Sequence, residues 1–266
     1  MSTRTLISAL SRCAIAAAII LPAGPLFAAE TAHPAGHVPH WGYTGDGGPA
    51  HWAQLEEDFG VCKLGLEQSP IDIPSARVKT AADLAPLDFG YRAGAGEVVN
   101  NGHTIQVNLA AGGTMTSSGT AFKLLQFHFH TPSEEKINGG NFPLVAHFVH
   151  RDAAGHLAVV AVLFKLGKKN AALAPVFDAM PVEEGGKATL APFDPSAVLP
   201  ADRRYYAFKG SLTTPPCSEG VAWHVLRTPV ELDWRQLEAF RKIFPRNARP
   251  VQPLHGREIR LSAPSP

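Results

Sequence analysis

Strand-like segments separated by turns dominate the chain after Trp41, and they constrain its fold more than any other feature. Each is rich in apolar and β-branched residues and is bounded by turn-forming residues, which is typical of strands. We predict strands at 98–110, 121–130, 144–152, 156–167, 205–212 and 221–232. Helical patterns occur at 169–180 and 233–244, and Asp233 is suited to be the N-cap of the second. No linker after Trp41 is long enough to separate two domains, so we expect one mainly β domain with short peripheral helices.

The first 29 residues are predicted to be a secretory signal peptide. Arg4 and Arg12 precede the apolar run 13–21, and small residues follow up to a cleavage point that we place near 28–29. The apolar run is too short for a comfortable membrane-spanning helix, so an uncleaved anchor is the weaker alternative. The mature protein would then be periplasmic or secreted, and the polar residues 30–40 would form a flexible tether ahead of the domain.

Removal of the signal peptide changes the charge balance and the cysteine count. It takes away two arginines and no acids, which leaves 22 of the 24 basic residues beside 23 acidic ones. A nearly even balance lacks the excess of basic residues that is typical of proteins that bind nucleic acid or an anionic membrane. Of three cysteines, Cys62 and Cys217 remain, and in an oxidising compartment we predict that they form a disulfide. Closing so long a loop would stabilise the fold by up to roughly 5 kcal/mol, and two buried free thiols are the weaker alternative.

The segment QFHFH at 126–130 places two histidines on one face of a predicted strand. Side chains alternate along a strand, so His128 and His130 share one face and the two phenylalanines share the other. His147 lies in the next predicted strand, and antiparallel pairing would bring it opposite the first two. Three neutral imidazoles would leave a zinc ion one open position. The alternation by itself also fits histidines that are satisfied structurally, and His150 is predicted to be such a buried, hydrogen-bonded residue on the other face.

Metal-bound imidazoles need a partner for their second nitrogen. Gln126 lies two residues before His128 on the same strand face and can accept a hydrogen bond from that ring. Val145 occupies the equivalent position before His147. Because valine is apolar, the third ring lacks a partner from its own strand.

A second polar cluster is GSLTTPPCSE at 210–219. A threonine hydroxyl here could accept a hydrogen bond from a hydroxide on the metal and donate its own proton to an ionised carboxylate, which only accepts. Glu134 or Glu135, just after the strand that carries His130, could serve as this carboxylate. A loop with a proline-restricted backbone is the alternative interpretation.

Together these segments resemble the α-class carbonic anhydrases of the exported bacterial type. The matching stretches occur in family order at 41–52, 68–73, 100–109, 126–134, 146–150, 157–167, 210–226 and 246–254. The combination of QFHFH, SE, AHFVH and GSLTTPP is highly specific. The resemblance implies a single domain over 41–262, with a short tail at 263–266. It also implies a large, mostly antiparallel twisted sheet, with Zn²⁺ at the base of a conical cleft.

The resemblance further implies reversible hydration of carbon dioxide to bicarbonate and a proton, through attack by hydroxide held on zinc. His128, His130 and His147 match the zinc ligands. Thr213 and Glu134 match the pair that orients the hydroxide, and His103 resembles the histidine that shuttles the proton to bulk water. The apolar wall that holds carbon dioxide is matched by Val149, Val159, Leu212, Val221 and Trp223. Polar positions around the cleft and behind the ligands are matched by Tyr43, Asn101, Gln126, Thr214 and Asn247.

Partners and covalent features follow from the same resemblance. Cys62 and Cys217 fall where exported members carry their disulfide. The expected small molecules are carbon dioxide and bicarbonate, with sulfonamides and anions as inhibitors. We expect a monomer or a homodimer that binds neither nucleic acid nor, after signal cleavage, a membrane.

The chain departs from the family pattern at Val145, where members usually carry glutamate to receive the ring proton of the third ligand. Loss of such a partner typically costs about 10–100-fold in metal affinity or activity. We therefore expect zinc to be held less firmly, or a water molecule or backbone carbonyl to substitute. Gln106 also departs from the shorter amide of many members, which should only reshape the cleft wall.

Three other families use some of the same elements. A cupin-type metal enzyme also combines HxH with a following glutamate, but Phe122 stands where that motif requires glycine. A copper–zinc dismutase pairs strand histidines with a disulfide, but it needs more ligands than the chain offers. A zinc-binding, carbonic-anhydrase-like adhesion protein without catalysis is the remaining alternative. Such relatives typically have a zinc ligand replaced, whereas His128, His130 and His147 are all present.

Overall fold

The computed structural model describes residues 40–264. The predicted signal peptide and all but the last residue of the predicted tether lie outside the described residues. Within 40–264, no helix is both long and apolar enough to cross a membrane.

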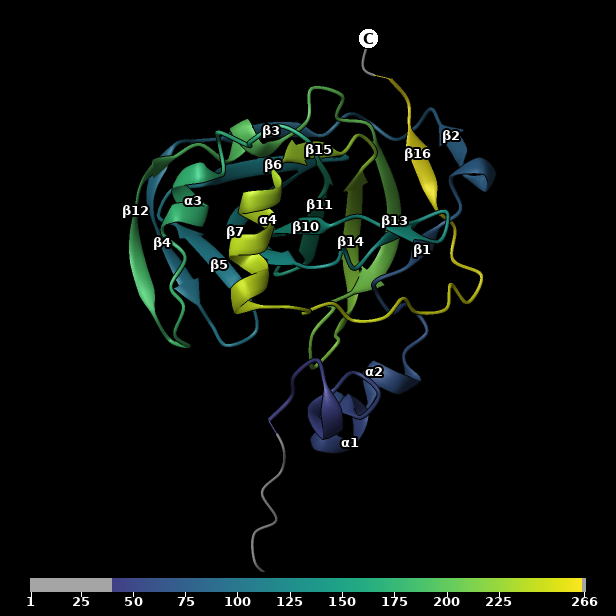
Figure 1. Ribbon diagram of the computed structural model, residues 1–266. Coiled ribbons are helices and arrows are strands. Elements are labelled where there is room, and N and C mark those ends of the chain that lie inside the picture. Colours follow the sequence, from purple (N-terminus) through teal and green to yellow (C-terminus); the bar gives the residue numbers. More distant parts are fainter. Residues whose placement is uncertain (1–39, 265–266) are drawn as a thin grey trace, which may run out of the picture. The chain divides into compact units, whose positions relative to one another are not determined.

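One 13-stranded sheet forms most of the fold (Figure 1). Its main path runs through β12 (Lys187–Phe193), β4 (Gly94–Asn100), β5 (Ile105–Leu109), β7 (Thr120–His130), β10 (Leu144–Arg151), β11 (Leu157–Leu166), β14 (Glu219–Leu226), β13 (Tyr205–Ser211), β16 (Arg260–Ser262) and β2 (Lys79–Ala81). Three further strands pair off this path, namely β15 (Val230–Leu232) with β11, β6 (Gly113–Ser117) with β7, and β3 (Asp88–Tyr91) with β6. Neighbours are mostly antiparallel, and β11–β14, β11–β15 and β16–β2 are parallel. The expectation of a mainly β, mostly antiparallel sheet is confirmed.

The remaining elements are short. A small sheet contains β1 (Asp72–Ile73), β8 (Lys136–Ile137) and β9 (Gly140–Asn141). The α-helices are α1 (Trp52–Leu55), α2 (Val61–Leu64), α3 (Ala174–Asp178) and α4 (Trp234–Ile243). Short 3₁₀ helices lie at Gly45–Gly47, Glu57–Phe59, Ser75–Arg77 and Pro195–Val198.

Several sequence-predicted elements have different limits in the structure. The single strand predicted at 98–110 is wrong, because the chain reverses between β4 and β5, which pair antiparallel. Gly102 lies in this reversal with φ of +84°, a conformation that favours glycine. The segment 221–232 is likewise divided into β14 and β15, and the helix predicted at 169–180 is reduced to α3.

Helix α4 forms where the sequence predicts it. The Asp233 side chain accepts a hydrogen bond from the backbone N–H of Gln236, and the Gln236 side chain accepts one from the backbone N–H of Asp233. This capping box satisfies backbone donors that the first helical turn would otherwise leave unpaired.

The two faces of the sheet carry different side chains, as alternation along the strands requires. Phe127 and Phe129 of β7 belong to the larger apolar core, where the Phe129 ring lies 5.6 Å from Phe177 of α3 and 5.9 Å from Phe240 of α4. Figure 1 shows α3 and α4 against this face of the sheet. His128 and His130 consequently point to the opposite face, beside a second apolar cluster that contains Val145.

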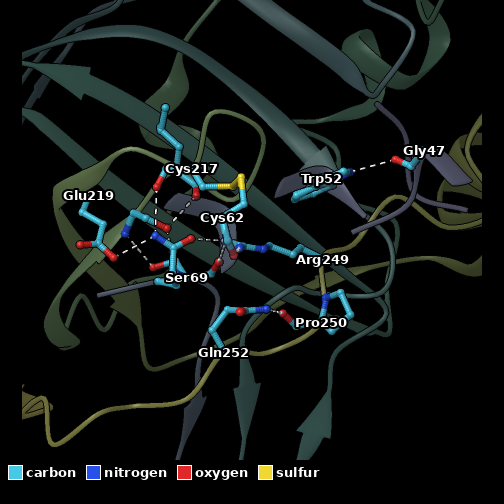
Figure 2. The surroundings of a disulfide bond; sticks show 12 residues. Gly47, Trp52, Cys62, Ser69, Cys217, Glu219, Arg249, Pro250 and Gln252 are labelled. Carbon is cyan, nitrogen blue, oxygen red and sulfur yellow. Dashed lines mark hydrogen bonds between the residues drawn. A yellow bond between two sulfur atoms is a disulfide. The ribbon is translucent and has the colours of Figure 1, made fainter. Parts of the chain in front are cut away.

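The predicted disulfide is present. Cys62 of α2 is bonded to Cys217, 155 residues later, with a Cα–Cα distance of 5.1 Å. Next to it, the buried guanidinium of Arg249 donates to the carbonyl of Cys62 at 2.7 Å and to the carbonyl of Ser69 at 2.7 Å (Figure 2). The same guanidinium lies over the Trp52 ring at 5.5 Å. Arg249 therefore ties the N-terminal helices to the C-terminal segment that passes beneath the histidines.

Candidate metal centre

Strand register brings the three predicted histidines together. In the antiparallel pair β7–β10, His147 lies directly opposite His128, and Val145 lies opposite His130. On the other side of β7, Gln106 of β5 lies opposite His128. Strands β7 and β10 carry the three histidines on one face of the sheet, so the predicted antiparallel pairing of these two strands is confirmed.

The three imidazoles form a compact group. One nitrogen from each ring can be chosen so that all three atoms lie within 4.8 Å of one another. Ring centroids are separated by 5.0 Å for His128–His130, 5.5 Å for His128–His147 and 4.8 Å for His130–His147. His130 and His147 are 1% exposed, and Nε2 of His130 is buried without a hydrogen-bond partner in residues 40–264.

The second nitrogen of each ring has a partner that can only accept. Nδ1 of His128 lies 2.9 Å from Oε1 of Gln126, and Nδ1 of His130 lies 2.7 Å from the backbone oxygen of Asn247. Nε2 of His147 lies 3.2 Å from Oε2 of Glu135. Each ring must therefore donate through this nitrogen, so in the neutral form of the ring its other nitrogen carries a free lone pair.

The ionisation of two of these rings suits a metal site. Burial, together with the nearby His147, lowers the pKa of His128 to about 3. The same two influences, with His128 in addition, lower the pKa of His130 well below its ordinary value. Burial also acts to lower the pKa of His147, but Glu135 and Glu134 outweigh it and raise the pKa. Three imidazoles, of which His128 is half-buried and the other two are buried, are each oriented by an outer acceptor and form a donor set that fits Zn²⁺ with an open coordination position.

Glu134 is the buried acid closest to the free nitrogens. Its Oε1 accepts a hydrogen bond from the backbone N–H of Arg249 at 2.8 Å, and its Oε2 lies 3.5 Å from Nε2 of His130 and 3.8 Å from Nδ1 of His147. Burial raises the pKa of the Glu134 carboxyl to about 7, although His147, the Thr213 hydroxyl and the Arg249 backbone act against this rise. Thr213 is 5% exposed, so the predicted pair is buried together beside the histidines.

A cavity of about 130 Å³ opens onto the histidines. Its lining includes His128 and His130, and it includes Tyr43, Asn101, His103 and Thr214 from the predicted polar positions. Tyr43 has a buried hydroxyl without a partner in residues 40–264, and burial and then Glu134 raise its pKa. A larger cavity of about 620 Å³ around Ser117 and His224 contains none of the three ligating histidines.

The predicted apolar-wall residues do not belong to the lining of this cavity. Val149, Val159, Val221 and Trp223 are buried members of one apolar cluster, and Leu212 packs against it. Val149 pairs with Val159, and Val159 with Trp223, across the strands β10, β11 and β14. The Trp223 ring lies 5.0 Å from the His147 ring, edge to face. The cluster thus borders the third histidine on its apolar side.

His103 lies in the reversal between β4 and β5. Its ring stacks on Trp41 with centroids 3.6 Å apart, and its Nε2 lies 3.1 Å from Nε2 of His40. Asn101 fixes the turn, because its Oδ1 accepts from the backbone N–H groups of His103 and Thr104. Partial burial and His40 lower the pKa of His103, which Glu184 partly offsets.

Comparison with known proteins gives the family. Residues 47–263 match the eukaryotic-type carbonic anhydrase family. The chain belongs to this family. A carbonic anhydrase of Neisseria gonorrhoeae is 45% identical over 244 residues, which cover 91% of this chain and 94% of that protein. One from Pectobacterium atrosepticum is 44% identical over 222 residues, covering 83% and 90%.

Solved structures agree with this assignment. The α-carbonic anhydrase from Thermovibrio ammonificans, in complex with the inhibitor sulfanilamide, has a TM-score of 0.81 and 50% identity. The alignment covers 83% of this chain and 98% of that one. The protein is an enzyme with carbonic anhydrase activity, and its histidine triad is typical of zinc binding in the family.

Two contacts in the site, and the use of the Asn247 main chain in a third, were not anticipated from the sequence. The expectation that water or a backbone carbonyl serves His147 is wrong, because the Glu135 carboxylate contacts its Nε2. Asn247 serves His130 through its main chain, while its side chain accepts from the Thr131 backbone at 2.8 Å. His40 contacts the predicted shuttle residue. The adjacent acids Glu134 and Glu135 were the sequence signal from which the Glu135 contact could have been found. The contact of His130 with the Asn247 main chain could not have been found in this way, because a backbone oxygen does not depend on the residue type.

Proposed function

We propose that His128, His130 and His147 hold the zinc ion with which this enzyme interconverts carbon dioxide and bicarbonate. The observation that carries the proposal is the arrangement of three converging rings, two buried and one half-buried, each with one nitrogen hydrogen-bonded to an acceptor and the other available to a metal ion. Zinc, when bound, lowers the pKa of a water ligand from 15.7 to about 7 and so supplies hydroxide at neutral pH.

Thr213 and Glu134 would orient the attacking oxygen. An ionised Glu134 can only accept, so a hydrogen bond from the Thr213 hydroxyl to this carboxylate leaves the threonine oxygen as an acceptor. That oxygen would then accept a hydrogen bond from the attacking hydroxyl group, which would turn a lone pair of the attacking oxygen toward the substrate carbon. The backbone N–H of Arg249 supports the ionised form, because it donates to Oε1 of Glu134 at 2.8 Å.

The apolar cluster would hold the substrate. Carbon dioxide is uncharged and gains little from strong hydrogen-bond donors, whereas valine and tryptophan side chains can enclose it. Val149, Val159 and Trp223 form a continuous row across three strands beside His147. Val221 and Leu212 extend this wall, and Thr214 would border it on the polar side.

His103 would carry the product proton to bulk buffer. It lines the same cavity as His128, and its imidazole contacts His40 near the surface. An imidazole can accept and release a proton near neutral pH, and polar side chains such as Tyr43 and Asn101 would order the intervening water. The route needs no movement of the zinc ligands.

Two further features of the proposal concern inhibitors and location. Sulfonamides and small anions should inhibit, as the sulfanilamide complex of the Thermovibrio ammonificans relative suggests. The disulfide and the bacterial relatives are consistent with a location outside the cytoplasm. We place the mature enzyme in the periplasm or the surrounding medium.

Stopped-flow measurement of carbon dioxide hydration, with zinc content determined on the same sample, tests the proposal. The expected result is about one zinc per chain and hydration that sulfanilamide abolishes. Zinc-replete protein without sulfonamide-sensitive hydration would instead favour a zinc-binding protein without catalysis. Absence of zinc after equilibration with the metal would remove the assigned ligand set.

A further inference from the structure

Glu135 lies at Nε2 of the His147 ring, whereas Glu134 lies nearer the other ring nitrogen, Nδ1. Oε2 of Glu135 is 3.2 Å from Nε2 of His147, and both residues are buried, at 0% and 1% exposure. Glu134 faces the other nitrogen, with its Oε2 3.8 Å from Nδ1. The two adjacent acids therefore contact opposite sides of one imidazole.

We infer that Glu135 is the positioning residue of His147: it holds the proton on Nε2 and keeps Nδ1 available to the metal. This inference rests on the proposed function, because it assumes that Nδ1 of His147 binds zinc. A carboxylate accepts and never donates when ionised, so it selects this tautomer and also fixes the plane of the ring.

The surroundings of Glu135 argue against a purely structural role. Its side chain has one hydrogen-bond partner, His147, and its Oε1 has none among residues 40–264. A buried acid with a single hydrogen bond costs folding free energy. Its effect on His147 is therefore a better reason for its presence than stability.

The backbone around Glu135 holds the carboxylate in place. Ser133 donates through Oγ to the backbone oxygen of Glu135 at 2.7 Å, and the backbone N–H of Lys136 donates to the carbonyl of Ile71 at 3.1 Å. Lys136 then begins β8, which pairs with β1. The segment is thus anchored on both sides of the glutamate, and the carboxylate has little freedom to leave the ring.

Val145 explains why the acceptor for His147 comes from a loop and not from strand β10. It lies two residues before His147 on β10, is fully buried, and belongs to the apolar cluster beside the site. By analogy with Gln126 and His128, an acceptor for His147 is expected at position 145, but valine has none. Glu135, in the segment between β7 and β8, supplies a carboxylate instead. The chain has in effect moved the acceptor from the strand to the loop.

Zinc dissociation into excess chelator, measured on the metal-loaded protein, tests this role. We expect Glu135→Gln, which keeps the size of the side chain but loses its charge, to speed dissociation by about 10–100-fold. Val145→Glu alone should not slow dissociation, because Nε2 is already engaged and a second buried acid would lie near the first. Glu135→Gln combined with Val145→Glu should restore most of the slow zinc dissociation of the native protein.

Glu219→Gln is the matched control. This acid accepts hydrogen bonds from the Glu67 backbone and the Gln68 side chain and contacts none of the three histidines.

A second readout separates positioning from structural support. In zinc-loaded protein labelled with ¹⁵N-histidine, the Nε2–H proton of His147 should be strongly deshielded in the native enzyme and shift upfield in Glu135→Gln. A dissociation rate within twofold of native together with an unshifted proton would overturn the inference, as would slower dissociation in Val145→Glu alone. If Glu135→Gln does not fold, Glu135→Asp, which retains the charge but shortens the reach, decides by the same two measurements. Native protein that fails to bind zinc would refute the proposed function, whereas unchanged variants of a zinc-binding native protein would refute only the role of Glu135.

Discussion

At the scale of single residues, the site depends on which nitrogen of each histidine ring is left available to a metal ion. The amide oxygen of Gln126, the backbone oxygen of Asn247 and the Glu135 carboxylate each occupy one nitrogen of a histidine. Because these oxygens only accept, they select the tautomer of each ring in its neutral form. The free lone pairs are thereby organised before any ion binds.

Loss of the Thr213 hydroxyl should lower catalysis without releasing zinc. Thr213→Val keeps the shape of the side chain but cannot accept a hydrogen bond from the attacking hydroxyl group, and misorientation of a reacting group costs about 10²-fold in rate. We expect kcat/KM for hydration to fall by about this factor, measured by stopped flow. Thr80→Val, on exposed β2, is the control and should retain native activity. A fall in zinc content equal to the fall in activity would contradict an orienting role.

Removal of the His103 imidazole should impair proton release but leave the attack on carbon dioxide intact. In dilute buffer, we expect His103→Ala to lower kcat by about 10²-fold, the low end of the contribution of a positioned proton-transfer group. The ratio kcat/KM should be unchanged, since it does not include release of the proton to buffer. Added imidazole should restore kcat in the variant, and failure of this rescue would argue against a shuttle.

At the scale of elements, β7 serves two functions through its two faces. One face contributes Phe127 and Phe129 to the core under α3 and α4, and the other presents His128 and His130. The core face holds the strand rigid, which fixes the separation of the two ligands. A shift of register by one residue would exchange the two faces, so the site and the core stabilise the same pairing.

Truncation on the core face of β7 should cost stability in the metal-free protein. Phe129 is fully buried, and Phe129→Ala should lower the free energy of unfolding by about 3–5 kcal/mol, because it leaves a cavity against α3 and α4. Urea unfolding monitored by tryptophan fluorescence measures this. Lys123→Ala, on an exposed position of the same strand, should change it by less than about 0.5 kcal/mol. Equal effects of the two variants would show that the strand is not held from its core face.

At the scale of the whole molecule, buried neutral histidines make stability depend on pH. As for His128 and His130, burial lowers the pKa of His224 to about 4 and that of His150 to about 3. His150 is buried and lies 2.7 Å from the Tyr91 hydroxyl, which confirms its predicted place in the core. Between the ordinary pKa of histidine and these lower values, the unfolded chain binds protons that the folded chain does not. The stability that these residues contribute is therefore complete above about pH 6.5 and is lost as the pH falls toward 4 and 3.

Replacement of His224 should reduce this sensitivity to acid. His224→Gln cannot gain a proton but can still bind the Ser117 hydroxyl, which lies 3.0 Å from Nε2. Between pH 6 and pH 4.5, the free energy of unfolding of the variant should fall less steeply than that of the native protein, by up to about 1.4 kcal/mol per pH unit. Denaturant unfolding at a series of pH values measures both slopes. The slopes should coincide between pH 7 and pH 8, and coincidence at low pH as well would show that His224 does not remain neutral there.

Much of the fold and of the candidate site could be predicted from residue patterns. Alternation placed His128 and His130 on one face of a strand, and the hypothesis of antiparallel pairing brought His147 opposite them. The helical pattern that begins at Asp233 located α4. The division of 98–110 into two strands was missed, because the apolar pattern resumes after the Gly102 reversal as though no turn intervened. Segments with weak patterns, such as β12, were also missed, since pairing with β4 supplies the order that their own composition does not.

The sequence by itself determined which histidines come together, which cysteines form the disulfide and the mainly β class, because these depend on residue type, on the number of cysteines and on spacing along one or two neighbouring strands. Only the tertiary structure decided which oxygen serves each histidine. The Asn247 carbonyl comes from a distant segment through its main chain, and the Glu135 carboxylate comes from a loop that β1 and β8 hold against the strands. Such contacts are set by the packing of segments remote in sequence, for which local periodicity carries no signal. The alternation of β10 predicts the acceptor for His147 at position 145, which is valine. Glu135 supplies this acceptor instead.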